Sequence, residues 1–72
     1  MKKINKIKIK LNGKFVNIQD SITLQNLIKK FKVPINKVAI ELNQEIIDKK
    51  KINKINLKKN DNIEIVHFIG GG

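Results

Sequence analysis

Near its start the chain alternates lysine with an aliphatic residue over residues 6–11 and then reads Asn12-Gly13. This alternation has the period of a β-strand with one apolar and one polar face. Asn-Gly strongly favours a two-residue hairpin turn, because both residues tolerate a positive φ. In the resulting register Phe15 lies on the polar face, beside Lys8 and Lys10. The opposite face is apolar and comprises Ile7, Ile9, Leu11, Val16 and Ile18.

A helix is predicted after this hairpin. Thr23 is suited to cap its N-terminus, and Ile22 and Leu27 are placed to form a hydrophobic staple. Pro34 ends the helix by Val33 at the latest. A helix of about nine residues is not stable alone in water, so we expect it to pack on the apolar face of the hairpin. The residues expected to face the hairpin are Leu24, Leu27, Ile28 and Phe31.

The rest of the chain predicts three further strands and one irregular stretch. Alternation of apolar with polar or small residues indicates a strand over 38–43, whose end forms a turn with Gln44. Short helical or irregular structure is expected over 48–57, with Ile52, Ile55 and Leu57 as anchors. A turn at 60–62 precedes the last strand. The two other strands are expected over 45–47 and 63–69. This order indicates an α+β fold with a mixed sheet of about five strands and one helix across one face.

The charge and the cysteine count exclude several classes of function. All 16 basic residues are lysine, only 6 residues are acidic, and the net charge is +10. Arginine, Tyr and Trp are absent, which argues against specific nucleic-acid binding, although a basic nucleic-acid module is kept as an alternative. Without cysteine the chain has no disulfide, zinc thiolate or cysteine nucleophile. No apolar run approaches the length of a membrane span, and no signal peptide is recognisable, so we expect an intracellular protein without membrane contact.

Three of the four glycines are the last three residues, Gly70, Gly71 and Gly72. Ordering a glycine run costs conformational entropy, and the run offers no side chain for packing. The run is therefore either a disordered extension or a segment whose backbone is itself functional. We predict a domain over residues 1–69 and a flexible tail over 70–72. Three extended residues span about 10 Å, enough to carry a terminal carboxylate into another protein's active site.

The strand before the tail suggests a docking surface. Strict alternation directs Val66 and Phe68 to the solvent face, where Phe15 could extend the patch. A β-bulge that turns both residues inward is the alternative. His67 is the only histidine, and no nucleophile or carboxylate cluster accompanies it in the sequence, so we expect no catalytic role and no metal site.

Taken together, the hairpin, the helix, the later strands and the terminal diglycine resemble the ubiquitin-like β-grasp fold. The chain is most similar to the ThiS family of sulfur carrier proteins in thiazole and thiamine biosynthesis. The resemblance covers nearly the whole length of the chain. Before the last strand, where the family usually has a Gly-Asp turn, this chain has Asn60-Asp61. Asparagine also tolerates the left-handed conformation of such a turn. The segments that carry the resemblance are residues 23–28, 38–43 and 61–72.

This resemblance implies that the Gly72 carboxylate is adenylated and converted to a thiocarboxylate, with Gly71 as a required neighbour. It implies three partners: an adenylyltransferase related to ubiquitin-activating enzymes, a sulfur donor fed by a cysteine desulfurase, and thiazole synthase. ATP belongs to the activating partner, and we expect no cofactor on this chain, which acts as a carrier and co-substrate rather than an enzyme. A molybdopterin synthase small subunit and a ubiquitin-like protein modifier are the neighbouring alternatives. We expect a free monomer in the cytoplasm, or in the plastid stroma if the gene belongs to the organelle.

Overall fold

The first two strands form the predicted hairpin. The computed structural model of the chain describes residues 5–68. In it β1 (Lys6–Leu11) pairs antiparallel with β2 (Lys14–Gln19), with Ile9 opposite Val16 and Ile7 opposite Ile18. The turn residues Asn12 and Gly13 have φ angles of 51° and 82°, as a two-residue turn with left-handed backbone requires. The predicted register is therefore confirmed.

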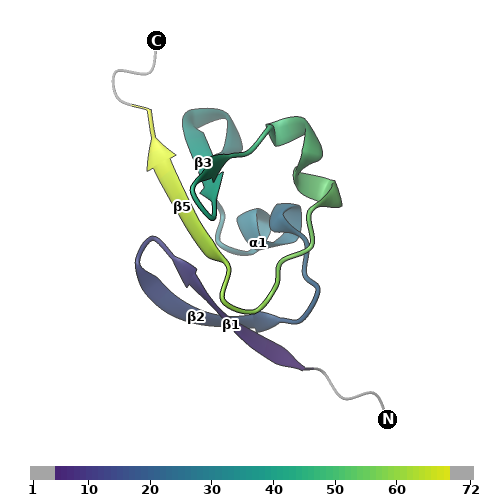
Figure 1. The fold of residues 1–72 in the computed structure, drawn as a ribbon. Helices are drawn as coiled ribbons and strands as arrows, with labels where there is room; N and C mark the ends of the chain where they lie inside the picture. The colour runs from purple at the N-terminus through teal and green to yellow at the C-terminus, as the bar shows by residue number, and fades with distance from the viewer. Residues whose placement is uncertain (1–4, 69–72) are drawn as a thin grey trace.

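Within residues 5–68, five strands form one mixed sheet in the order β2-β1-β5-β3-β4. Its remaining members are β3 (Val38–Leu42), β4 (Glu45–Ile46) and β5 (Asn62–His67). β5 lies between the N-terminal hairpin and β3, and it runs parallel to β1 but antiparallel to β3 (Figure 1). The mixed sheet with one α-helix confirms the predicted α+β fold. The fourth strand is one residue shorter than predicted.

The α-helix is shorter than predicted, and one of its expected core residues is exposed. α1 (Leu24–Lys30) begins after Thr23, whose Oγ1 accepts a hydrogen bond from the Asn26 amide at 3.1 Å. Leu24, Leu27 and Ile28 are buried as expected. The prediction for Phe31 is wrong, because this side chain is 42% exposed. Phe31 is the C-cap, with φ −93° and ψ 7°, so its side chain no longer follows the apolar stripe of the helix.

The segment between β4 and β5 covers the same face of the sheet as α1. It contains the 3₁₀ helix η2 (Lys49–Lys54), which follows η1 (Ile35–Lys37) in the chain. Figure 1 shows α1 and η2 on the same side of β5. Ile52 and Leu57 are buried, and Ile55 packs against the core from a half-buried position, so the three predicted anchors are confirmed. The buried core comprises Ile9, Ile18, Leu24, Leu27, Ile28, Val38, Ile40, Ile52, Leu57 and Ile63.

Because the helical segments cover one face only, the other face of the sheet is open to solvent. Its outward residues include Lys8 and Lys10 on β1 and Phe15 on β2, all of them exposed. Within residues 5–68, no helix has the length and apolar character needed to cross a membrane.

Candidate functional site

β5 leads the chain toward its C-terminus, and its two halves have different neighbours. Its first residues pair on one side with β1, through Lys10 opposite Asn62 and Leu11 opposite Ile63. Pairing with β3 on the other side continues as far as His67, and the Phe68 amide then donates to the Lys37 carbonyl at 2.9 Å. The hairpin turn ends beside the middle of β5. Beyond the hairpin turn β5 pairs with β3 alone, so Phe68 lies at the margin of the sheet.

Side-chain hydrogen bonds fix the position of β5. The Ile65 amide donates to Asn12 Oδ1 at 2.7 Å, which ties the hairpin turn to the strand. Asp61, before the strand, accepts from Asn43 Nδ2 at 3.0 Å and from the Lys58 amide at 2.8 Å. The Asn62 amide donates in turn to Asn43 Oδ1 at 2.9 Å. The last strand is therefore held by contacts from two other turns.

The turn before β5 has the predicted left-handed asparagine. Asn60 has a φ of 72°, the conformation expected where the ThiS-like pattern usually has glycine. The Asn60 amide also donates to the Lys8 carbonyl at 2.9 Å, so this turn packs on β1. Asparagine thus supplies both the backbone geometry and the contact.

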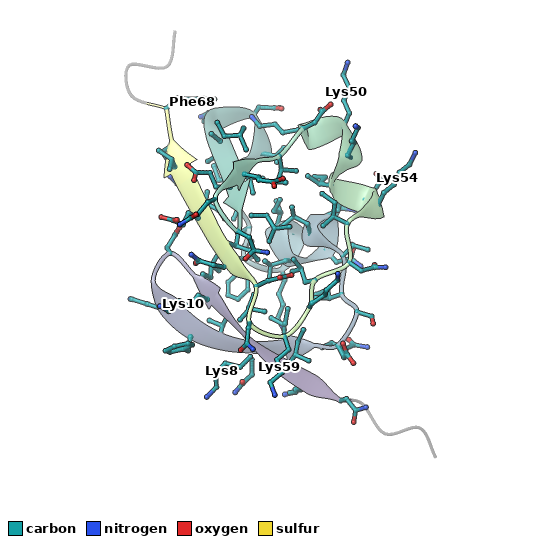
Figure 2. The ribbon with its side chains drawn as sticks, viewed as in Figure 1. Lys8, Lys10, Lys50, Lys54, Lys59 and Phe68 are labelled. Atoms are coloured by element: carbon teal, nitrogen blue, oxygen red, sulfur yellow. The ribbon has the colours of Figure 1, made fainter. Side chains whose placement is uncertain are left out.

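Val66 and Phe68 are exposed and form what we call the β5 patch. Their exposed fractions are 52% and 56%, so outward placement is confirmed and the inward bulge is excluded. Lys49 Nζ lies 5.2 Å from the centroid of the Phe68 ring, a cation–π distance. The patch therefore combines an apolar surface with a positive charge at the end of the described chain, where Phe68 is labelled in Figure 2.

Phe15 is also exposed, at 67%, but it lies apart from the β5 patch. It is opposite Lys10, which aligns with Asn62, and Val66 lies four residues farther along β5. Four strand residues span about 13 Å, so Phe15 does not extend the patch as a continuous surface. A role of Phe15 in docking stays a prediction, and it concerns a surface separate from the β5 patch.

The remaining predicted residues divide into two groups. His67 is exposed on β5 opposite Val38, and residues 5–68 contain no group of three His, Cys, Asp or Glu side chains that could hold a metal ion. Gly70, Gly71 and Gly72 lie outside the described residues, so their chemistry stays a prediction. Sequence reasoning missed the hydrogen bonds of Asn12 and Asn43, which it had assigned only to turns.

Comparison with known proteins identifies the family. The model of the ThiS family matches residues 3–72. The chain belongs to the ThiS family. It is 42% identical over 65 residues to the sulfur carrier protein ThiS of Bacillus subtilis, covering 89% of this chain and 98% of that protein. The crystal structure of a ThiS thiamine biosynthesis protein from Geobacter metallireducens superposes with a TM-score of 0.82 at 28% identity, over 92% of this chain and 100% of that chain.

A third similarity involves a larger protein. Thiazole synthase of Magnetococcus marinus is 38% identical to this chain over 66 residues, which cover 92% of this chain but only 20% of the synthase. The family membership and the Bacillus relative identify the chain as a ThiS sulfur carrier of thiamine biosynthesis. A ThiS protein is a carrier rather than a catalyst. This role agrees with a fold that presents a strand end and an exposed patch.

Proposed function

We propose that this chain carries sulfur as a thiocarboxylate on Gly72. A carboxylate is a poor electrophile, so a partner enzyme first transfers AMP from ATP to it, with release of pyrophosphate. The terminal sulfur of a donor persulfide then attacks the carbonyl carbon and AMP leaves, which gives an acyl disulfide. A thiol of the partner proteins attacks the donor-side sulfur of this disulfide, so the S–S bond breaks, the terminal thiocarboxylate is released and a disulfide forms on the partners. The observation that supports this proposal is the course of β5, which ends at His67, five residues before Gly72.

The length and composition of the last residues suit entry into a partner's active site. Four residues in extended conformation span about 13 Å beyond Phe68. Gly70, Gly71 and Gly72 lack Cβ atoms, so the segment fits a narrow channel and leaves the terminal carbonyl accessible to a nucleophile. The folded domain presents the tail, and the partners supply the catalytic groups and bind the ATP.

Three partners follow from this chemistry. An adenylyltransferase related to ubiquitin-activating enzymes activates Gly72, and a sulfur donor supplied by a cysteine desulfurase provides the sulfur. Thiazole synthase is the acceptor. The Magnetococcus thiazole synthase supports the last assignment, because one fifth of that chain matches this carrier and thus joins both parts in one protein. Successive partners require a carrier that is free between encounters, so we propose that it is a monomer when free. We propose the cytoplasm or the plastid stroma as its compartment.

The β5 patch is proposed as the surface that docks these partners. Val66 and Phe68 adjoin the tail, and an exposed apolar pair at this position is suited to a protein interface. Lys49 adds a positive charge over the Phe68 ring. Docking here would place the tail within reach of the partner's active site.

Intact mass spectrometry tests the proposal. The chain is incubated with the activating enzyme, ATP and the sulfur donor, and its mass is expected to rise by the difference between one sulfur and one oxygen atom, localised to Gly72. A chain that lacks Gly72 should keep its circular dichroism spectrum and thermal midpoint and gain no sulfur. The Bacillus carrier is the positive control for the activity of the partners. An unchanged mass beside an active control, or full thiazole formation with the truncated chain, would contradict the proposal.

A further inference from the structure

A groove distinct from the β5 patch lies where the hairpin meets the turn before β5. Its volume is about 350 Å³. Lys8 and Lys10 come from β1 and Phe15 from β2, so the groove opens on the sheet face that the helices leave uncovered. The residues that line it are Lys8, Ile9, Lys10, Phe15, Asn60 and Asn62.

Two lysines place their ammonium groups around one aromatic ring in this groove. Lys8 Nζ lies 5.6 Å and Lys10 Nζ 5.3 Å from the centroid of the Phe15 ring. The Asn60 amide donates to the Lys8 carbonyl at 2.9 Å, which joins the turn before β5 to this part of β1. The groove therefore combines an exposed aromatic surface with two positive charges.

The groove contains no compensating carboxylate. None of its six lining residues is acidic. The Asp61 carboxylate, next in sequence to two of them, accepts hydrogen bonds from Asn43 and the Lys58 amide. Glu64 is the next outward residue along β5 after Asn62, and it stands opposite Glu41 on β3. The positive charge of the groove is thus bounded on one side by an acidic pair.

We infer that this groove binds an acidic segment of a partner protein. Carboxylates of the segment meet Lys8 and Lys10, and an apolar side chain of the segment covers the Phe15 ring. Opposite charges on two surfaces raise the association rate and fix the register of docking. The identity of the partner as the activating enzyme rests on the proposed function, but binding of an acidic segment does not.

The chemistry of the groove favours a peptide over a phosphate or a nucleic acid. Lysine alone can bind phosphate, but phosphate sites commonly add clustered backbone amides or the fork of arginine. Here the Lys10 amide donates to the Asp61 carbonyl and the Asn60 amide to the Lys8 carbonyl, and the chain has no arginine. Phe15 is the only ring in the groove, whereas strand-binding proteins stack successive bases on several rings. The Asn60 and Asn62 side-chain amides provide donors and acceptors for a peptide backbone.

An NMR titration at low salt tests the inference. The probe is a short synthetic peptide of glutamates around a single leucine, added to the ¹⁵N-labelled full chain without activating enzyme or ATP. We expect shifts of the amides of Lys8, Lys10, Phe15 and Asn60, and affinity about tenfold weaker in Lys8→Glu/Lys10→Glu. The matched control Lys50→Glu/Lys54→Glu changes the net charge equally on η2, at the other side of the molecule (Figure 2), and should lose less than about threefold.

Each other result would overturn the inference. Equal losses in the two charge-reversed variants would assign binding to net charge rather than to the groove. A glutamine version of the peptide that binds equally well would exclude recognition of carboxylates, and an oligothymidylate that binds the groove more tightly would identify it as a nucleic-acid site. Lys8→Gln/Lys10→Gln replaces the charge-reversed variant if that chain does not fold. Because the assay needs no sulfur transfer, its failure is distinct from failure of the proposed function.

Discussion

Phe68 and Phe31 show how the exposure of one aromatic side chain depends on where it leaves its element. Phe68 continues the outward positions of β5 and is 56% exposed, whereas Phe31 leaves α1 at the C-cap and is 42% exposed. Strand alternation predicted the exposure of Phe68 correctly, although burial no longer alternates at this end of β5, where Val66 and His67 are both exposed. Helical spacing failed for the second, because the helix ended one residue before Phe31.

Replacing Phe68 with alanine should separate docking from stability. Because the side chain is largely solvated, we expect the free energy of unfolding to fall by less than about 1 kcal/mol. If Phe68 is a docking anchor, the dissociation constant for the activating enzyme should rise by about tenfold or more. Urea unfolding and isothermal titration calorimetry measure the two effects. Phe31→Ala is the matched control and should leave the dissociation constant unchanged, and equal weakening by both variants would remove the special role of Phe68.

Asn12 has a second function that no local pattern reveals. Its place in a two-residue turn is readable from Asn12-Gly13 alone. Its Oδ1 also accepts from the Ile65 amide, a residue 53 positions away. Only the tertiary fold brings these residues together, so sequence patterning could not have found the contact.

Asn12→Gly isolates this contact, because glycine retains the positive φ of 51° while removing the side-chain acceptor. We expect the free energy of unfolding to fall by about 1 kcal/mol. The Ile65 amide should also exchange its hydrogen faster. Gly13 in the same turn is left intact, so the hairpin register is preserved. Unchanged exchange at Ile65 would show that the bond contributes nothing to holding β5.

At the scale of elements, the strands and helix follow from the sequence, but the neighbours of β5 do not. Periodicity predicted β1, β2, β3 and the position of β5, since each has one buried face. Periodicity did not predict that β5 lies between β1 and β3 in the sheet. That placement is fixed by the parallel pairing with β1 and by the hydrogen bonds of Asn43 and Asp61. The exposed margin that forms the candidate site is a consequence of this insertion.

Removing the Asp61 carboxylate should loosen the start of β5. Asp61→Ala deletes acceptors for the Asn43 side chain and the Lys58 amide, so we expect a loss of about 1–3 kcal/mol in the free energy of unfolding. Asp20→Ala removes the same charge from an exposed position before α1 and should cost less than about 0.5 kcal/mol. Chemical denaturation of both variants measures the difference. Equal losses would assign the effect to net charge and not to the turn.

At the scale of the whole molecule, the core is apolar and the charged side chains lie outside it. In the described chain, the core consists of ten buried apolar residues and contains no buried charged or polar residue. The charged side chains of residues 5–68 therefore lie outside the core, and the excess of sixteen lysines over six acidic residues in the sequence makes net repulsion dominate. This surface attracts acidic partners but works against compactness.

Added salt should consequently stabilise this protein. Screening at about 0.5 M sodium chloride shortens the range of repulsion to a few ångström, so we expect the free energy of unfolding to rise by about 1 kcal/mol over its value at low ionic strength. Urea unfolding across a salt series measures this rise. Lys50→Glu/Lys54→Glu lowers the net charge through exposed residues of η2, so its stability should depend less on salt. A free energy of unfolding that falls with salt would mean that attraction between the six carboxylates and the lysines outweighs the repulsion of the lysines for one another.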